Sequence, residues 1–228
     1  MDGTESRVVV HMVASLDGYI ARKDGGVDWL DTTDVFDGGE TLSSESVEEF
    51  LKSIDCYVMG SRTYETAVGF EAKGMGWAYG TKPTFVLTSR ELNKTRDNVE
   101  FHAGDVRQLI EQRLRPRYRS IWIVGGADVC GDCLRRGLVD EVRYSILPVL
   151  IGDGISFFAG LDAAIALPLM ESKAYGNGMI ALRYEVRPFN IHVSLVEPGL
   201  IRTRFKDNMQ LPAPASAASP YAPLTAKI

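Results

Sequence analysis

The 228-residue chain contains only three cysteines and three histidines, and these low numbers exclude several classes of protein. An odd, small number of cysteines is typical of a reducing compartment and not of a disulfide-rich secreted domain. The scattered histidines and the single Cys130-Gly131-Asp132-Cys133 pair do not supply the four ligands of a structural zinc site, so we expect no metal. The pair also has redox-motif spacing, but we favour two small residues on a helix because the usual aromatic or proline context is missing.

The chain also lacks an excess of basic charge and a long apolar run. Its net charge of -5 argues against nucleic-acid binding through a general basic surface. The sequence has no apolar run long enough to span a bilayer. The start, Met1-Asp2-Gly3-Thr4-Glu5, has neither the basic residues nor the apolar stretch of a secretory signal. We therefore expect a cytoplasmic protein that binds a small-molecule substrate but neither nucleic acid nor a membrane.

Apolar, β-branched runs alternate with amphipathic segments through the first two thirds of the chain. Buried strands are predicted at 8–14, 54–59, 84–88, 99–101 and 121–124. Helices are predicted at 43–53, in a short segment after 63, at 105–114 and at 128–136. Two further strands, 141–150 and 180–186, follow without a helix between them. This order predicts an α/β fold with a mostly parallel central sheet flanked by helices and an antiparallel C-terminal edge.

Three strand-to-helix junctions carry glycine or hydroxyl residues: Gly60-Ser61-Arg62-Thr63, Thr88-Ser89-Arg90 and Val124-Gly125-Gly126-Ala127. In a parallel sheet they fall at the carboxyl ends of the strands, where open α/β sheets bind ligands. Glycine lets the backbone approach a phosphate, and the following helix offers unpaired N–H donors. Taken alone, a Gly-Gly junction is more often a tight turn, and an arginine such as Arg90 is more often a solvated surface residue. Together they suit a dinucleotide, and the two arginines favour NADPH over NADH.

The usual G-x-G-x-x-G fingerprint of dinucleotide binding is absent from the first strand-to-helix turn. Instead, Val13–Ala21 resembles the first strand and loop of the reductase domain of the bifunctional riboflavin-biosynthesis deaminase-reductase, in the dihydrofolate reductase-like superfamily. Met59–Glu65, Val86–Arg90 and Ile123–Ala127 resemble its phosphate loop, its 2′-phosphate strand and its glycine pair. Leu147–Gly154 resembles its P-x-x-x-G-x-G turn. The matches are in order over roughly residues 6–187.

That resemblance implies a dihydrofolate reductase-like fold and NADPH-dependent reduction of a small heterocycle. The nearest named activity is 5-amino-6-(5-phosphoribosylamino)uracil reductase. The resemblance also implies a homodimer and a set of residues that contact the cofactor. These are Gly60, Arg62, Thr63, Thr88, Ser89, Arg90, Val124, Gly125, Gly126 and Ala127, with Ala14 and Ile20 near the nicotinamide. Asp17 borders the pocket and is the candidate catalytic residue, with an Asp-Gly turn as an equal alternative.

The chain departs from related families in two respects. The zinc motif of the deaminase is missing, so we expect a stand-alone reductase domain. The carboxylate with which dihydrofolate reductases bind the pterin is not in register, because its place falls near Ser44. The neighbouring Glu48 fits a solvated helix face better. A dihydrofolate reductase-type enzyme and a non-catalytic nucleotide-binding homologue stay open as alternatives.

The character of the chain changes after Arg187, so we divide it into a reductase-type domain at 6–187 and an appended segment at 188–228. Residues 212–223 are rich in Ala, Pro and Ser, which is typical of a disordered or loosely packed tail. Residues 190–205 resemble a strand and Pro-Gly turn of short-chain dehydrogenases. The other motifs of that family are absent, so we assign this segment no catalytic role. Its apolar strand is expected to pair with the main sheet or with a second subunit.

Overall fold

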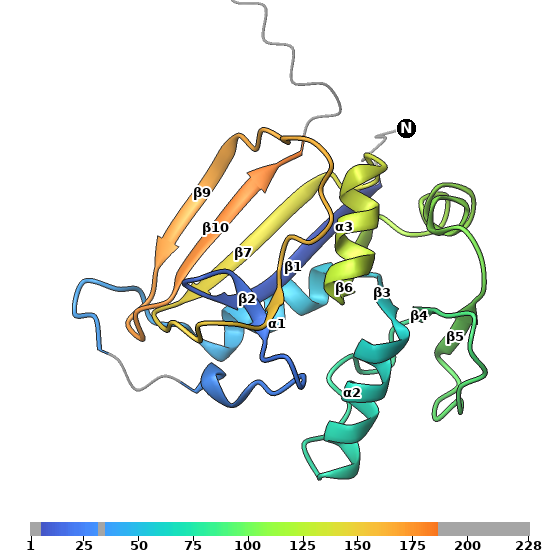
Figure 1. Cartoon of the computed structure of the whole chain (residues 1–228), viewed down its shortest axis with the longest axis horizontal. Helices are drawn as coiled ribbons and strands as arrows, with labels where there is room; N and C mark the ends of the chain where they lie inside the picture. The colour runs from blue at the N-terminus through green and yellow to red at the C-terminus, as the bar shows by residue number, and fades with distance from the viewer. Residues whose placement is uncertain (1–5, 32–34, 187–228) are drawn as a thin grey trace, which may run out of the picture. The chain divides into compact units, whose positions relative to one another are not determined.

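The computed structural model describes residues 6–31 and 35–186, which contain an eight-stranded sheet flanked by helices (Figure 1). The strand order is β5-β4-β3-β6-β1-β7-β10-β9. The first six of these are parallel: β5 (Val99–His102), β4 (Thr84–Leu87), β3 (Cys56–Gly60), β6 (Ser120–Gly125), β1 (Arg7–Ser15) and β7 (Glu141–Leu147). The antiparallel edge is formed by β10 (Ile180–Glu185) and β9 (Leu169–Ala174). The predicted fold class is confirmed.

The central strands are buried on both faces, which explains why they read as continuous apolar runs. In β6, Ile121 and Ile123 face one side and pack with α3 (Ala127–Arg135) and the π-helix Gln108–Leu114. The alternate residues Trp122 and Val124 face the other side, where they pack with α1 (Ser44–Ser53) and α2 (Ser61–Ala72). Helices therefore cover both faces of the sheet, as the alternation of strands and helices predicts.

Local sequence explains where the first two helices begin. The helix α1 (Ser44–Ser53) is capped by Ser43, whose hydroxyl accepts a hydrogen bond from the N–H of Ser46 at 3.2 Å. The helix α2 (Ser61–Ala72) starts directly after β3 and is longer than the short helix expected there. None of the helices in the described ranges is long and apolar enough to cross a membrane.

The structure corrects several predicted boundaries. The strand expected to run to 150 ends at Leu147, because Pro148 has no N–H to donate to the ladder. The helix predicted at 105–114 is π-helical over most of its length. Four elements escaped prediction: the edge strand β9, the 3-10 helix Asp28–Leu30, and the strands β2 (Tyr19–Ala21) and β8 (Ile155–Ser156). The last two form a separate two-stranded sheet. The expectations for the appended segment, including the likeness at 190–205, lie outside the described residues.

Candidate nucleotide-binding site

The parallel strands bring the three junctions to one edge of the sheet. The strand β3 pairs with β4 on one side and with β6 on the other, so their carboxyl ends are neighbours. The residues at these strand ends are 60–63, 88–90 and 125–127. The first and third segments lead directly into α2 and α3, whereas 88–90 leads through a loop to β5 and not to a helix, so the prediction of a strand-to-helix junction there was wrong. The first strand ends beside them at Ser15, because β1 pairs with β6. We call these strand ends and their loops the strand-end edge.

Two of the loops touch at their glycines. A methyl group built on Gly60 would lie 3.2 Å from Val129 and 3.8 Å from the amide nitrogen of Gly126. A methyl group on Gly126 would lie 3.5 Å from the hydroxyl oxygen of Thr63. The peptide bond between Gly125 and Gly126 is cis. At Gly60 and Gly126 no side chain stands between a ligand and the backbone, which favours the close approach of a phosphate.

Gly125 is held in a conformation that favours glycine. Its φ angle is +136°, and a methyl group added there would lie 3.2 Å from the sulfur of Met12. An L-residue at this position would be strained in its backbone and crowded in its side chain. The glycine that the sequence places after β6 therefore has a structural reason to be there.

Both helices that begin at the strand-end edge start after a glycine. Gly60 precedes α2 and Gly126 precedes α3, and neither can cap the helix with a side chain. The first-turn N–H groups therefore have no side-chain acceptor from the N-cap residue, and the helix dipole adds partial positive charge. Two helix N-termini side by side form a suitable binding surface for a pyrophosphate.

The two arginines of the strand-end edge are already paired with carboxylates. Arg62 donates to Asp128 Oδ2 at 2.7 Å, and Arg90 donates to Glu65 Oε2 at 2.7 Å. All four side chains are about half or more exposed. The hydroxyl oxygen of Thr88 accepts a hydrogen bond from the backbone N–H of Arg90 at 2.9 Å and so shapes the loop between them. The cationic groups are thus at the edge, but each has an internal partner that the sequence did not reveal.

The remaining candidate contact residues contribute backbone more than side chain. Ala14 and Ala127 are buried, with exposed fractions of 0% and 6%. Ile20 and Val124 are partly buried and pack against the core. Near the end of β1, a ligand would therefore meet main-chain atoms next to Ala14, because the side chain of Ala14 is buried in the core.

Asp17 joins two loops. Its carboxylate accepts hydrogen bonds from the Ser15 hydroxyl at 2.6 Å and from the N–H groups of Gly152 at 2.7 Å and Ile151 at 3.3 Å. The bond from Ser15, helped by the two backbone donors, lowers the pKa of the Asp17 carboxyl. An anionic carboxylate with three donors suits a loop anchor, and a lowered pKa is poorly matched to proton donation at neutral pH.

Other polar candidates behave as the sequence indicated. Glu48 is exposed and pairs with Lys52 at 3.2 Å, so it lies on the solvated face of α1. Cys130 and Cys133 are buried, unbridged thiols of α3. Burial raises the pKa of Cys133 to about 12 and raises that of Cys130 as well. These thiols are therefore unreactive core residues. Within 6–31 and 35–186 we find no group of His, Cys, Asp and Glu that could hold a metal ion.

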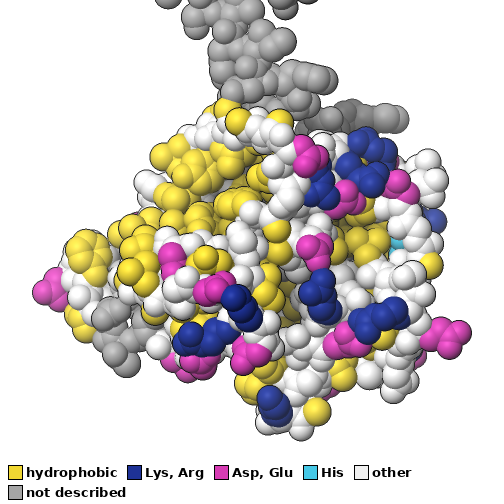
Figure 2. Space-filling model, in the orientation of Figure 1, with side chains coloured by type: hydrophobic (Ala, Val, Ile, Leu, Met, Phe, Trp, Pro, Cys, Tyr) yellow, Lys and Arg dark blue, Asp and Glu magenta, His cyan; other side chains and the backbone are white. Residues whose placement is uncertain are grey.

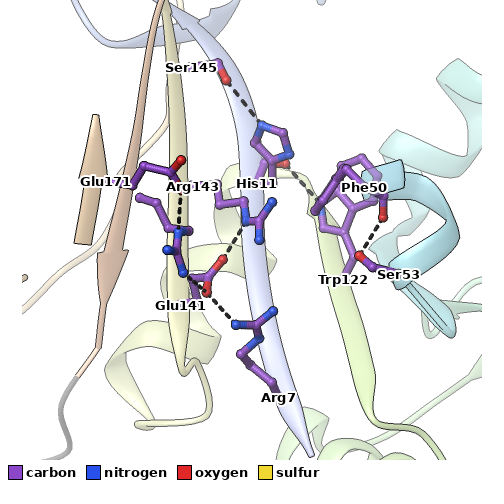
Figure 3. Close-up of polar contacts among 10 residues, drawn as sticks. Arg7, His11, Phe50, Ser53, Trp122, Glu141, Arg143, Ser145 and Glu171 are labelled. Atoms are coloured by element: carbon purple, nitrogen blue, oxygen red, sulfur yellow. Dashed lines mark hydrogen bonds and ion pairs between the residues drawn. The ribbon is translucent and has the colours of Figure 1, made fainter. Parts of the chain in front are cut away.

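Sequence reasoning missed a partly buried polar cluster whose residues lie on β1, β7 and the antiparallel edge (Figure 3). His11 on β1 contacts the Ser145 hydroxyl at 3.2 Å through Nε2, while its Nδ1 is buried without a partner. Burial, together with the positive charge of Arg143, lowers the pKa of His11 to about 4 despite the opposing charge of Glu141. The signal was the alternation Glu141-x-Arg143-x-Ser145 in β7, which places polar residues on one face of a buried strand.

A hollow of about 270 Å³ lies at the opposite end of the sheet, where β7 begins and β10 ends. Val139, Asp140 and Val186 line it together with the last turn of α3. It contains none of the candidate nucleotide-binding residues. The candidate site is therefore formed by the loops of the strand-end edge and not by this hollow.

Comparison with known proteins points to one family. Residues 71–181 match the RibD C-terminal domain. Two uncharacterized proteins of Bacillus subtilis strain 168, YwjB and YyaP, are 28% identical over 175 residues and 25% identical over 187 residues. The alignments cover 77% and 79% of this chain and 95% of each relative.

Two solved structures share the fold. A Shewanella protein named for riboflavin biosynthesis is 24% identical with a TM-score of 0.67, covering 79% of this chain and 99% of that one. A diaminohydroxyphosphoribosylaminopyrimidine deaminase/5-amino-6-(5-phosphoribosylamino)uracil reductase from Thermotoga maritima is 15% identical with a TM-score of 0.56. That match covers 80% of this chain but 57% of the longer enzyme. The described chain has the fold of RibD-type reductases.

Proposed function

We propose that this protein is a stand-alone, NADPH-dependent reductase, because residues 71–181 match the RibD C-terminal domain and the fold is that of RibD-type reductases. The observation that carries the proposal is the convergence of three loops at the strand-end edge. Gly60, Thr63 and Gly126 lie close together there, and two helices begin there. The cradle fits a dinucleotide, because a side chain at either glycine would fill the space that phosphates need.

Each part of the edge has its own task in this proposal. The helix N-termini after Gly60 and Gly126 bind the pyrophosphate through backbone N–H groups. Arg90, with Thr88 and Ser89 beside it, binds the 2′-phosphate of the adenosine. The end of β1 near Ala14 and Ile20 borders the nicotinamide, which supplies the hydride. The protein's contribution to the reaction is to hold donor and acceptor in register and to exclude water.

Asp17 anchors the loop that borders the substrate in this proposal. Its three hydrogen-bond donors keep it ionised at neutral pH, so it fixes the loop between β1 and β2 against the loop at Gly152. A role for Asp17 in proton transfer stays a prediction, which the stability and activity of Asp17→Asn test together. The cytoplasmic location and the homodimer expected from the sequence are likewise proposals, and light scattering tests the second.

For the substrate we propose a ribosylaminouracil, reduced as 5-amino-6-(5-phosphoribosylamino)uracil reductases reduce theirs. Dihydrofolate is the runner-up. It is disfavoured because the two carboxylates close to the expected position at Ser44, Glu45 and Glu48, are both exposed, and Glu48 pairs with Lys52. The test is to follow NADPH oxidation with each compound in turn. We expect turnover with the ribosylaminouracil. Turnover with dihydrofolate alone would favour the runner-up, and NADPH binding without any turnover would favour a non-catalytic homologue.

A further inference from the structure

The two arginines of the strand-end edge each form an ion pair with a carboxylate of the same chain. Arg90 is bound by Glu65 of α2, and Arg62 is bound by Asp128 in the first turn of α3, both at 2.7 Å. Figure 2 shows the same pattern more broadly, because basic and acidic side chains stand next to one another on the face that it displays. A phosphate that reaches either arginine therefore meets a carboxylate already in place.

The two pairs differ in which part of a dinucleotide they face. Asp128 lies two residues after Gly126, so its pair with Arg62 adjoins the proposed pyrophosphate site, which NADH and NADPH share. Glu65 pairs with Arg90, the proposed partner of the 2′-phosphate, which only NADPH carries. The charge of Asp128 acts on both cofactors, whereas the charge of Glu65 acts mainly on NADPH.

Simple electrostatics gives the direction of the effect. A phosphate monoester near neutral pH carries up to two negative charges, so it is repelled by a carboxylate that remains within about 5 Å. A ribose 2′-hydroxyl is uncharged and can donate a hydrogen bond to a carboxylate, the arrangement that favours NADH in other dinucleotide sites. Exposed ion pairs are weak, so a nucleotide can displace the pair, but the carboxylate stays nearby.

We propose that Glu65 is a specificity-determining residue that limits the preference of this protein for NADPH over NADH. The inference rests on the proposed function, because it requires Arg90 to lie at the adenosine 2′ position. It assigns Glu65 no part in hydride transfer. Glu65 competes with the 2′-phosphate for Arg90 and offers the 2′-hydroxyl of NADH an acceptor instead.

Calorimetric titration of the full-length protein tests this with four probes: NADPH, NADH, 2′,5′-ADP and 5′-ADP. The test variant is Glu65→Gln. The first control is Asp128→Asn, which removes the carboxylate of the other ion pair, and the second is Glu48→Gln, which removes an exposed carboxylate away from the edge. For Glu65→Gln we expect affinity for NADPH and 2′,5′-ADP to rise about five- to ten-fold, and the gain to shrink with added salt. Affinity for NADH and 5′-ADP should fall by no more than about two-fold, because the amide oxygen of glutamine still accepts a hydrogen bond from the 2′-hydroxyl.

The comparison variants make the test specific. Asp128→Asn should raise the affinity of all four probes alike, and Glu48→Gln should change none of them. Equal gains for both cofactors in Glu65→Gln, or no gain at all, would overturn the inference while the proposed function stands. If no probe binds the wild-type protein, the proposed function fails and the inference fails with it. Thermal unfolding of each variant checks that these exposed substitutions leave the fold intact.

Discussion

Asp17 and Gly152, which are 135 residues apart in sequence, tie together two loops that border the strand-end edge. The N–H of Gly152 donates to the Asp17 carboxylate at 2.7 Å, beside a second backbone donor from Ile151 and the hydroxyl of Ser15. The loop after β1 is thereby fixed to the loop after β7. Because the first loop borders the proposed nicotinamide position, this contact positions one wall of the proposed pocket.

The substitution Asp17→Asn should lower stability, because an amide has one acceptor oxygen where the carboxylate has two, and no charge. The folded-state pKa of Asp17 is lowered, so its stabilising effect is present above the unfolded pKa and disappears as pH falls through the folded pKa. Urea unfolding of both proteins at neutral and at strongly acidic pH measures this. The difference between them should be clear at neutral pH and should vanish in acid. Unchanged stability with complete loss of turnover would instead support a role in proton transfer.

The substitution Gly125→Ala should weaken nucleotide binding. At a φ of +136°, alanine is strained by about 1–3 kcal/mol, and its methyl group would crowd Met12. The matched control is Gly74→Ala, which has a φ of +86° and open space around it. We expect both variants to lose stability and only Gly125→Ala to lose affinity for NADPH. Equal affinity in the two variants would contradict a nucleotide site at this loop.

The carboxylate of Glu141 holds the arginines in the polar cluster of Figure 3. It is 4% exposed and contacts Arg7 at 2.8 Å, Arg143 at 2.5 Å and Arg183 at 3.5 Å. Glu141→Gln leaves these charges without their buried partner and should destabilise the protein by about 2–4 kcal/mol. Glu171→Gln, at a half-exposed site that also pairs with Arg183, should cost less than about 1 kcal/mol. Chemical denaturation measures both values, and similar losses would refute the structural role of Glu141.

The buried ring of His11 should make the protein sensitive to mild acid. Its pKa is about 4 when folded and 6.5 in its ordinary state, so between these pH values the unfolded chain binds more protons. As the pH is lowered through that window, the free energy of unfolding should therefore decrease, by a total on the order of 3 kcal/mol. His11→Leu should remove this part of the slope. Unfolding curves from pH 7 to pH 4 measure it, and parallel slopes in both proteins would contradict the assignment.

The central strands were predictable because each is an apolar run that needs burial on both faces. The run 84–88, for example, corresponds to Thr84–Leu87 in the structure. The edge strand Leu169–Ala174 was not predictable, since its Leu-Met-Glu-Ser-Lys-Ala sequence is largely exposed and shows no clean alternation. Its partner Ile180–Glu185 holds it in place by backbone hydrogen bonds, which side-chain patterns do not encode.

The glycine and hydroxyl residues of the candidate site were recognisable because they follow directly on apolar runs that predict parallel strands, whose carboxyl ends share one edge of the sheet. The partners of its arginines were not, because Asp128 is 66 residues from Arg62 and Glu65 is 25 residues from Arg90. Contacts of this kind depend on how loops approach one another in three dimensions. The same holds for His11, whose burial against Ser145 follows from the pairing of β1 with β7.

The most direct test of a nucleotide site at the strand-end edge is a fluorescence titration of the full-length protein with NADPH and with NADH. The wild-type protein should bind NADPH saturably. Arg90→Ala should weaken NADPH binding and leave NADH binding nearly unchanged, because only NADPH carries the 2′-phosphate. Absence of saturable binding for both cofactors would contradict the account.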